Sequence, residues 1–254
     1  MLPIDRVVID GRLAGASDLS AAVTARYGHF TAMQVRDRRV RALDLHLARL
    51  RDATRELFGI ELDTGLVLDS IRTALGDDVR DASVRVYVTQ ADPVMVLAAV
   101  RPPTETPAGP YRLRSVVYQR FLPHVKHLGG FPQAYLGQTA SADGFDEVLF
   151  TLPDGTVCEG AVTNVGCFDG ERVVWPDGPQ LAGTGMLLMR RAPGVEHVTR
   201  TVNVADLPGF AAVFVVNSWG VVPVSSVDGV ELACDKDAMG MLIRSHDDTA
   251  WDPI

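Results

Sequence analysis

Apolar positions before residue 101 recur with two different periods. Segments that alternate or run apolar as strands do are 7–10, 30–35, 84–89 and 94–100. Leucines spaced three and four apart over 43–58 predict an amphipathic helix, and Asp63 or Thr64 can cap a second helix after it. Residues 37–39 indicate the turn between two paired strands. This mixture predicts a small α/β domain at the N-terminal end.

A stretch rich in proline, residues 101–110, is too polar to pack and predicts a domain boundary. We therefore expect an N-terminal domain over 1–105 and a C-terminal domain over 106–254. After the boundary, short apolar runs separated by Asp-Gly turns predominate, at 147–152, 157–160, 165–168, 172–175, 214–216 and 221–224. We expect the first four runs to form consecutive antiparallel pairs.

Helices are expected in the second domain at 133–142, 185–191 and 235–244. The predicted fold class is therefore α+β, with a small N-terminal α/β domain and a larger, strand-rich C-terminal domain.

Composition narrows the classes of ligand. The chain has 254 residues and a formal charge of -8, which argues against nucleic acid or an anionic membrane as partner, because both attract a basic surface. No run approaches the roughly 20 apolar residues of a membrane span, and the N-terminus lacks the pattern of a leader, so we expect a cytoplasmic protein. The three cysteines lack metal-site spacing, which predicts free thiols and no metal. A small molecule is the expected ligand.

Only two residues, Lys126 and Lys236, carry a primary amine in the side chain. Acidic neighbours make Lys236 a typical solvated charge on a helix. Lys126 lies in the apolar, glycine-ended stretch 121–130, where burial would lower its pKa and make the amine nucleophilic. Two alternatives remain: Lys126 is an ordinary exposed lysine in a loop, or the chain has few lysines only because its composition prefers arginine.

Three other features could bind charged groups of a ligand that reacts with this amine. Arg49 lies one helical turn after His46 on the leucine-rich helix and can direct a guanidinium at an anion, although a surface arginine lying along the helix is the alternative. Glu159 interrupts an apolar strand, and a buried carboxylate there needs a cationic partner. The glycine-bearing loop 181–186 leads into an apolar helix, so its N–H groups could bind phosphate.

In this order along the chain, these residues resemble the class IV pyridoxal-phosphate-dependent aminotransferases. That family includes the branched-chain and D-amino-acid aminotransferases and aminodeoxychorismate lyase. The similar segments are short but follow one another along nearly the whole chain: 27–31, 46–50, 126–128, 159–164, 181–184 and 217–224. The resemblance implies a two-domain enzyme of fold type IV that binds pyridoxal 5'-phosphate and forms a homodimer.

The resemblance also implies roles for individual residues. Lys126 would form a Schiff base with the cofactor and move the substrate proton, and Glu159 would pair with the pyridinium nitrogen. The residues implied to bind the cofactor beside these two are Arg49, Asn164, Thr184, Gly185 and Ser218. Substrate-binding residues are expected to be Arg85, Tyr27 and Thr31. Arg85 shares a strand face with Tyr87 and could bind a carboxylate, but an ordinary surface arginine would show the same pattern.

Three positions depart from the family pattern. Thr31 stands where aminotransferases commonly carry glutamate, as in some lyase members, and Phe131 stands where branched-chain enzymes carry a tyrosine. In the phosphate loop, Ala182 and Met186 replace the usual proline and arginine. A typical branched-chain enzyme is therefore not expected.

The predicted function is the transfer of an amino group between an amino acid and a 2-oxo acid, with no nucleic acid or membrane as partner. An aminodeoxychorismate lyase that releases pyruvate is the first alternative. A homologue that binds the cofactor without turnover is the second, and a non-enzymatic α+β binding module is the third.

Overall fold

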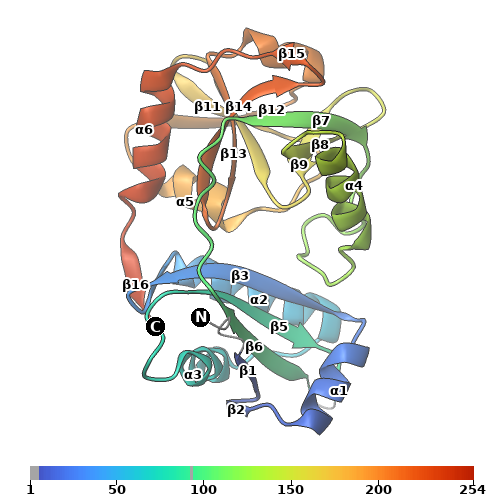
Figure 1. Cartoon of the computed structure of the whole chain (residues 1–254), viewed down its shortest axis with the longest axis vertical. Helices are drawn as coiled ribbons and strands as arrows, with labels where there is room; N and C mark the ends of the chain where they lie inside the picture. The colour runs from blue at the N-terminus through green and yellow to red at the C-terminus, as the bar shows by residue number, and fades with distance from the viewer. Residues whose placement is uncertain (1–5, 92–93) are drawn as a thin grey trace. The chain divides into compact units, whose positions relative to one another are not determined.

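The structure is a computed structural model that describes residues 6–91 and 94–254. Its contacts divide the chain into two units, each with a sheet of its own (Figure 1). The first unit takes in the described residues up to Glu105 together with Val125–Gly129 and Ala250–Ile254. The second unit takes in Thr106–His124 and Gly130–Thr249. That the two units are domains in the functional sense stays a prediction.

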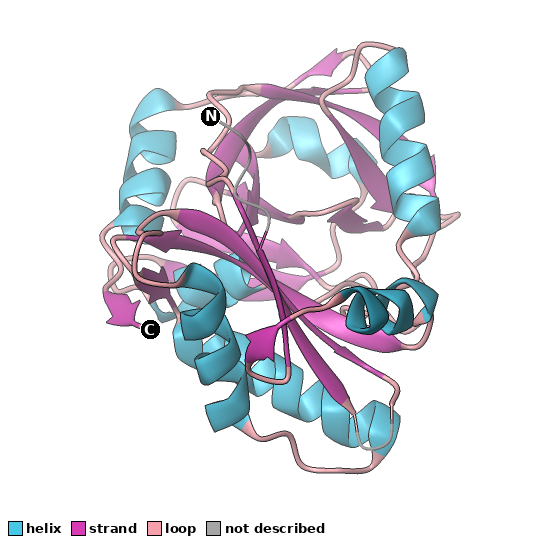
Figure 2. Ribbon diagram, turned by 60° about the horizontal axis from the view of Figure 1, so that its bottom comes forward, coloured by secondary structure: helices cyan, strands magenta, loops and turns pink. Residues whose placement is uncertain are grey.

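The first unit is a seven-stranded antiparallel sheet in the order β16-β4-β3-β5-β6-β1-β2. Its strands are β1 (Arg6–Ile9), β2 (Arg12–Leu13), β3 (Gly28–Arg36), β4 (Arg39–Arg41), β5 (Ala82–Thr89), β6 (Met95–Arg101) and β16 (Trp251–Pro253). Its helices are α1 (Ala16–Thr24), α2 (Leu43–Phe58) and α3 (Thr64–Leu75). Helices α2 and α3 pack on the sheet through contacts with β3 and β6. Figure 2 distinguishes the helices of the chain from its strands by colour. The helix predicted over 43–58 is confirmed, and Asp63 is the N-cap of α3, where it accepts two backbone N–H bonds.

The alternation along strand β5 shows which residues lie on each face of this sheet. Val84, Val86 and Val88 are fully buried in the core that includes residues of α2 and α3. Arg85 and Tyr87 alternate with the valines and therefore lie on the other face, as the period of two predicts. This second face carries the polar and aromatic residues of the strand.

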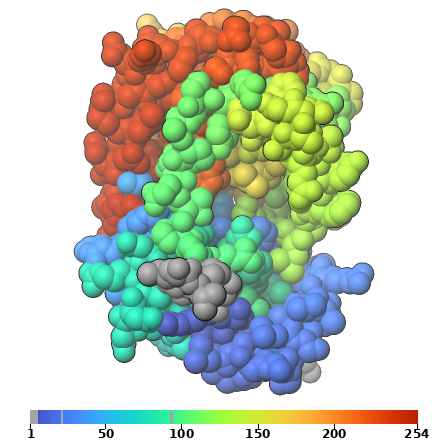
Figure 3. Space-filling model, viewed as in Figure 1, coloured from blue at the N-terminus to red at the C-terminus, as the bar shows by residue number. Residues whose placement is uncertain are grey.

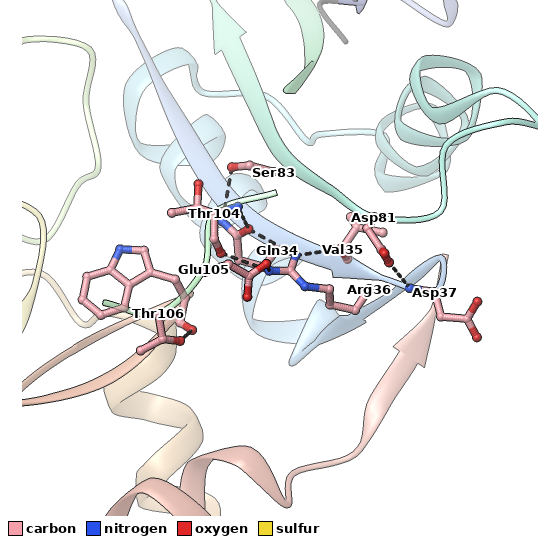
Figure 4. Close-up of polar contacts among 10 residues, drawn as sticks. Gln34, Val35, Arg36, Asp37, Asp81, Ser83, Thr104, Glu105 and Thr106 are labelled. Atoms are coloured by element: carbon pink, nitrogen blue, oxygen red, sulfur yellow. Dashed lines mark hydrogen bonds and ion pairs between the residues drawn. The ribbon is translucent and has the colours of Figure 1, made fainter. Parts of the chain in front are cut away.

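The start of the proline-rich stretch is held to β3. Arg36 donates to the carbonyl of Thr104 at 3.0 Å and pairs with Glu105 at 3.1 Å, while the Thr104 N–H donates to Gln34 at 2.9 Å (Figure 4). Gln34 in turn donates to Ser83 at 3.2 Å. Residues 101–106 are exposed, as expected of a stretch too polar to pack, and polar side chains of the sheet bind the backbone of Thr104.

The second unit contains a nine-stranded sheet in the order β12-β11-β10-β13-β14-β7-β8-β9, with β15 paired to β14. Its strands are β7 (Tyr111–Val117), β8 (Glu147–Thr151), β9 (Val157–Gly160), β10 (Asn164–Phe168), β11 (Arg172–Pro176), β12 (Glu196–Arg200), β13 (Ala212–Asn217), β14 (Gly220–Val227) and β15 (Val230–Glu231). The helices are α4 (Phe131–Ala142), α5 (Thr184–Arg191), the 3-10 helix η1 (Val204–Gly209) and α6 (Lys236–Asp247). All three predicted helices of this region are present. Among the described residues, no helix is long and apolar enough to cross a membrane.

The expected antiparallel pairs are confirmed in part, and the two units differ from the expected domains at two segments. Strands β8 and β9 pair antiparallel, as do β10 and β11, but β10 pairs with β13 and not with β9. The sequence boundary also assigned 125–129 and 250–254 to the second domain. Both segments belong to the first unit because residues 126–128 hydrogen-bond to β3 and β16 pairs with β4.

Candidate functional site

Lys126 lies on a short extended segment at the edge of β3. The Phe30 N–H donates to the Lys126 carbonyl at 2.9 Å, and the Leu128 N–H donates to the Gly28 carbonyl at 3.0 Å. The half-buried Lys126 side chain places its Nζ 4.9 Å from the centre of the Phe30 ring. These contacts fix the lysine by its backbone and leave its amine beside an aromatic ring.

A buried histidine connects three of the predicted site residues. His46 of α2 is 2% exposed, and its Nδ1 lies 2.7 Å from the Thr31 hydroxyl oxygen. Burial, and to a smaller extent the positive charges of Arg49 and Lys126, lower the pKa of His46 to about 3. Thr31, Arg49 and Lys126 therefore gather around a neutral imidazole within the first unit.

We predict that His46 makes the stability of the protein depend on acid pH. Because the pKa is depressed from 6.5 to about 3, the native state binds fewer protons than the unfolded state between these values, so stability is lost as pH falls through that window. Between pH 6.5 and pH 4.5, the free energy of unfolding measured in urea should fall by roughly 2 kcal/mol more in wild type than in His46→Gln. His124→Gln, at an exposed histidine, is the matched control. Equal losses in wild type and His46→Gln would contradict this assignment.

The other two predicted substrate residues do not join this group in the described contacts. The Tyr27 hydroxyl donates to the Leu57 carbonyl at 3.3 Å, and its ring packs edge-on against Phe58 at 5.5 Å. Arg85 is exposed on β5, on the strand face that also carries Tyr87, whose ring stacks on Phe30 at 5.5 Å. Tyr27 is thus engaged in packing, whereas Arg85 is available to a ligand on the face that carries Phe30 and Tyr87.

Glu159, the buried strand carboxylate, has the cationic partner that its position requires. It lies on β9 and is 7% exposed. One carboxylate oxygen lies 3.2 Å from Nε of Arg120, and the other accepts the Leu181 N–H at 3.0 Å. Arg120 is itself buried and also donates to the Pro123 carbonyl. The prediction of a cationic partner is confirmed, and Leu181 brings the carboxylate to the loop before α5.

Asn164 holds the same loop from β10. Its amide donates to the Leu181 carbonyl at 2.7 Å and to the Gln180 side chain at 2.9 Å. A Cβ atom at Gly183 would overlap the Asn164 Oδ1, so only glycine allows this approach. Glu159 and Asn164 therefore bind the N–H and the carbonyl of one residue, Leu181.

The start of α5 lies against the hairpin that carries Ser218. Helix α5 begins at Thr184, one residue before the predicted start at 185. A Cβ atom at Gly185 would overlap the carbonyl oxygen of Asn217. Ser218 and Trp219 form the turn after Asn217, because Asn217 and Gly220 are paired. The second unit thus brings Thr184, Gly185 and the Ser218 turn together at a helix N-terminus, where N–H groups lack partners within the helix.

Sequence reasoning missed Arg120 and Glu147. Arg120 lies in a loop with no periodic pattern, and its only signal is an arginine between aromatic residues six positions before Lys126. Glu147 opens the apolar strand β8 and resembles an exposed first residue, yet it is 7% exposed. Phe131 is the first residue of α4, a helix at the surface of the second unit (Figure 3), and is 78% exposed. Lys236 is exposed on α6, as predicted.

The two groups of residues have complementary chemistry. The first unit provides an amine and a guanidinium around the neutral His46. The second unit provides a fixed carboxylate and the start of a helix, which attracts anions. In the first unit the amine can react with an aldehyde or carbonyl. In the second unit the carboxylate can pair with a basic nitrogen, and the helix start can bind an anion.

Comparisons with known proteins agree on the fold. A Mycobacterium tuberculosis structure described as a hypothetical aminotransferase in its PLP-bound form has a TM-score of 0.79 and 23% identity, with 95% of this chain and 97% of that chain covered. Escherichia coli branched-chain amino acid aminotransferase has a TM-score of 0.80 at 16% identity, with coverages of 94% and 92%. A provisionally named 4-amino-4-deoxychorismate lyase from Legionella pneumophila has a TM-score of 0.79 at 16% identity, with coverages of 89% and 92%. The chain therefore has the fold of type IV aminotransferases.

Sequence comparison identifies the family. No curated protein shows significant sequence similarity to the chain. The sequence model of the amino-transferase class IV family, however, matches residues 28–227, which include every predicted site residue except Tyr27. The chain belongs to the class IV aminotransferase family.

Proposed function

We propose that the protein is a pyridoxal-phosphate-dependent transaminase that moves an amino group between an amino acid and a 2-oxo acid. The observation that carries this proposal is the buried Glu159, fixed on one side by Arg120 and on the other by the N–H of Leu181. A strand carboxylate in this position is costly to bury and has a clear use as the partner of a ring nitrogen. Family membership supports the cofactor and the reaction class.

The residues present fit pyridoxal phosphate. The cofactor needs an amine for its aldehyde, an acid for its ring nitrogen and donors for its phosphate. Lys126 is one of only two lysines, and the other, Lys236, lies exposed on α6. Glycines 183 and 185 permit close backbone approaches at the start of α5 that any Cβ would block. These approaches are made by Asn164 and by the Asn217 carbonyl, and they hold the start of α5, whose N–H groups can bind a phosphate.

Each residue has a proposed role. Lys126 is the attachment point for the cofactor and moves the substrate α-proton. Arg49 is proposed as a phosphate ligand, as are the N–H groups of Thr184 and Gly185 and the hydroxyl of Ser218. When bound, the cofactor supplies an electron-accepting ring that stabilises negative charge on the substrate carbon.

Glu159 is proposed to hold the proton on the ring nitrogen, and Asn164 to keep the phosphate loop in place. Arg85 is proposed to bind a substrate carboxylate, because it is exposed and shares its strand face with Tyr87. Tyr27 and Thr31 are the remaining proposed substrate-binding residues.

We further propose a cytoplasmic homodimer. The exposed aromatic residues Phe131 and Tyr135, which stack at 6.1 Å on α4, support a protein contact there. Sedimentation at several concentrations should give twice the mass of the chain, and a monomer at all concentrations would contradict the dimer.

The transaminase assignment has a direct test. Purified protein supplied with pyridoxal phosphate and a panel of L- and D-amino acids should bleach the absorbance of the bound cofactor, and 2-oxo acids should restore it. Amino transfer that depends on the 2-oxo acid supports the proposal. Release of pyruvate from aminodeoxychorismate without a 2-oxo acid would establish the lyase instead.

One observation favours the lyase as a second candidate. Thr31 replaces a glutamate common in aminotransferases, and its hydroxyl is fixed by His46 at 2.7 Å rather than free to rotate. A fixed hydroxyl near the amine is a suitable proton carrier for an elimination. Thr31→Val should then abolish pyruvate release, whereas in a transaminase, where Thr31 is proposed only to contact the substrate, it should raise KM and leave kcat largely unchanged.

A further inference from the structure

Glu147 is a buried carboxylate with no role in the proposed reaction. It is the first residue of β8 and accepts the N–H groups of Val148 and Ala161, each at 3.2 Å. Its other oxygen accepts the Thr163 hydroxyl at 3.3 Å. A carboxylate is a costly choice at a buried position, so its hydrogen bonds to the turn over 161–163 are the feature that explains it.

The turn that Glu147 holds joins two proposed cofactor-binding residues. Glu159 precedes it and Asn164 follows it, and the turn is closed by the Gly160 N–H, which donates to the Thr163 carbonyl at 2.8 Å. A Cβ atom at Gly160 would overlap the Thr163 hydroxyl and would lie 3.3 Å from the Glu147 carboxyl carbon. The carboxylate, the glycine and the threonine therefore form one tightly packed support beneath the turn.

We propose that Glu147 is a positioning residue: its buried carboxylate fixes the turn over 160–163, and through this turn it fixes Glu159 and Asn164 on Leu181, at the loop that begins α5. This inference rests on the proposed function, because it assigns Glu147 to the support of the proposed cofactor site. Both ends of the turn contact the same loop residue, since Glu159 accepts the Leu181 N–H and Asn164 donates to the Leu181 carbonyl. Loosening the turn should loosen both contacts at once.

The support responds to pH near neutrality. Burial raises the pKa of Glu147 to about 7, against the effect of its hydrogen bonds, which lower it. The titratable residues on the elements packed against β8 are Tyr111, Arg112 and Arg114 on β7, Cys158 and Glu159 on β9, and Tyr135 on α4. Arg112 pairs with Asp146, Arg114 with Asp143, and Glu159 with Arg120. An ionised carboxylate accepts hydrogen bonds more strongly than a protonated one, so the turn should be firmest above pH 7.

Amide hydrogen exchange of the cofactor-free protein tests this proposal directly. The probe is Glu147→Gln, with the exposed Glu196→Gln on β12 as matched control. After correction for intrinsic rates, protection of the Ala161 and Leu181 amides in wild type should rise about tenfold between pH 6 and pH 8. Glu147→Gln should remove the rise for both amides, and the control should retain it.

Affinity for pyridoxal phosphate gives a second readout on the same proteins. Glu147→Gln should weaken binding about tenfold at pH 8 and less at pH 6. If Glu147→Gln does not fold, Thr163→Val removes one donor and should show part of each effect. Unchanged Leu181 protection, or loss confined to Ala161, would overturn the positioning role. Failure of wild type to bind the cofactor would instead overturn the proposed function, because the exchange experiment needs no cofactor.

Discussion

Lys126→Ala should lower amino transfer by about 1000-fold or more while the protein remains folded. The loss is large because the same side chain is proposed to attach the cofactor and to move the proton, and each role is expected to contribute strongly. The fold should survive because the hydrogen bond from the Phe30 N–H uses the backbone carbonyl of residue 126 and not its side chain. Steady-state kcat and urea unfolding on the same preparation measure both outcomes.

The second lysine of the chain provides the control for this change. Lys236→Ala removes the same charge from an exposed position at the start of α6 and should leave kcat unchanged. Lys126→Arg keeps a positive charge near His46 but cannot provide the amine, so it should be as inactive as Lys126→Ala. Substantial turnover in either variant at position 126 would reject the assigned role.

Glu159→Gln should lower kcat by about 100-fold with the cofactor still bound. Glutamine can still accept the Leu181 N–H, so the loop before α5 should keep its position. It removes the negative charge that pairs with Arg120 and that is proposed to keep a proton on the ring nitrogen. Measuring kcat and the dissociation constant of the cofactor separately distinguishes lost chemistry from lost binding.

The exposed Glu171 supplies a matched control for this substitution. Glu171→Gln removes a carboxylate from a turn in the same unit and should leave both constants unchanged. Arg120→Met should act through Glu159, because it leaves a buried carboxylate without its cation, and should also destabilise the protein. Equal kcat for wild type and Glu159→Gln would mean that another group serves the ring nitrogen.

Local patterns in the sequence predicted individual elements well. The leucines of α2 predicted its bounds because a single helix face is buried, and Val84, Val86 and Val88 predicted the two faces of β5. The need of Glu159 for a cation also followed from its position on an apolar strand. These inferences depend only on residues close together in the chain.

Long-range pairing could not be predicted from such patterns. The pattern of short apolar runs did not indicate that β10 pairs with β13, because strand order depends on contacts between distant segments. Arg120 was missed as the partner of Glu159 because nothing in its own loop marks it as buried. Glu147 was missed because a glutamate that opens an apolar run is usually exposed.

Mapping the lysine that binds pyridoxal phosphate tests the central claim most directly. The protein should be incubated with the cofactor, reduced with borohydride to trap any linkage, digested and analysed by mass spectrometry. Because the chain has only two lysines, the result is unambiguous. We predict a pyridoxyl group on the peptide that contains Lys126 and none on the peptide that contains Lys236. A label on Lys236 or no label on either lysine would contradict the proposed site.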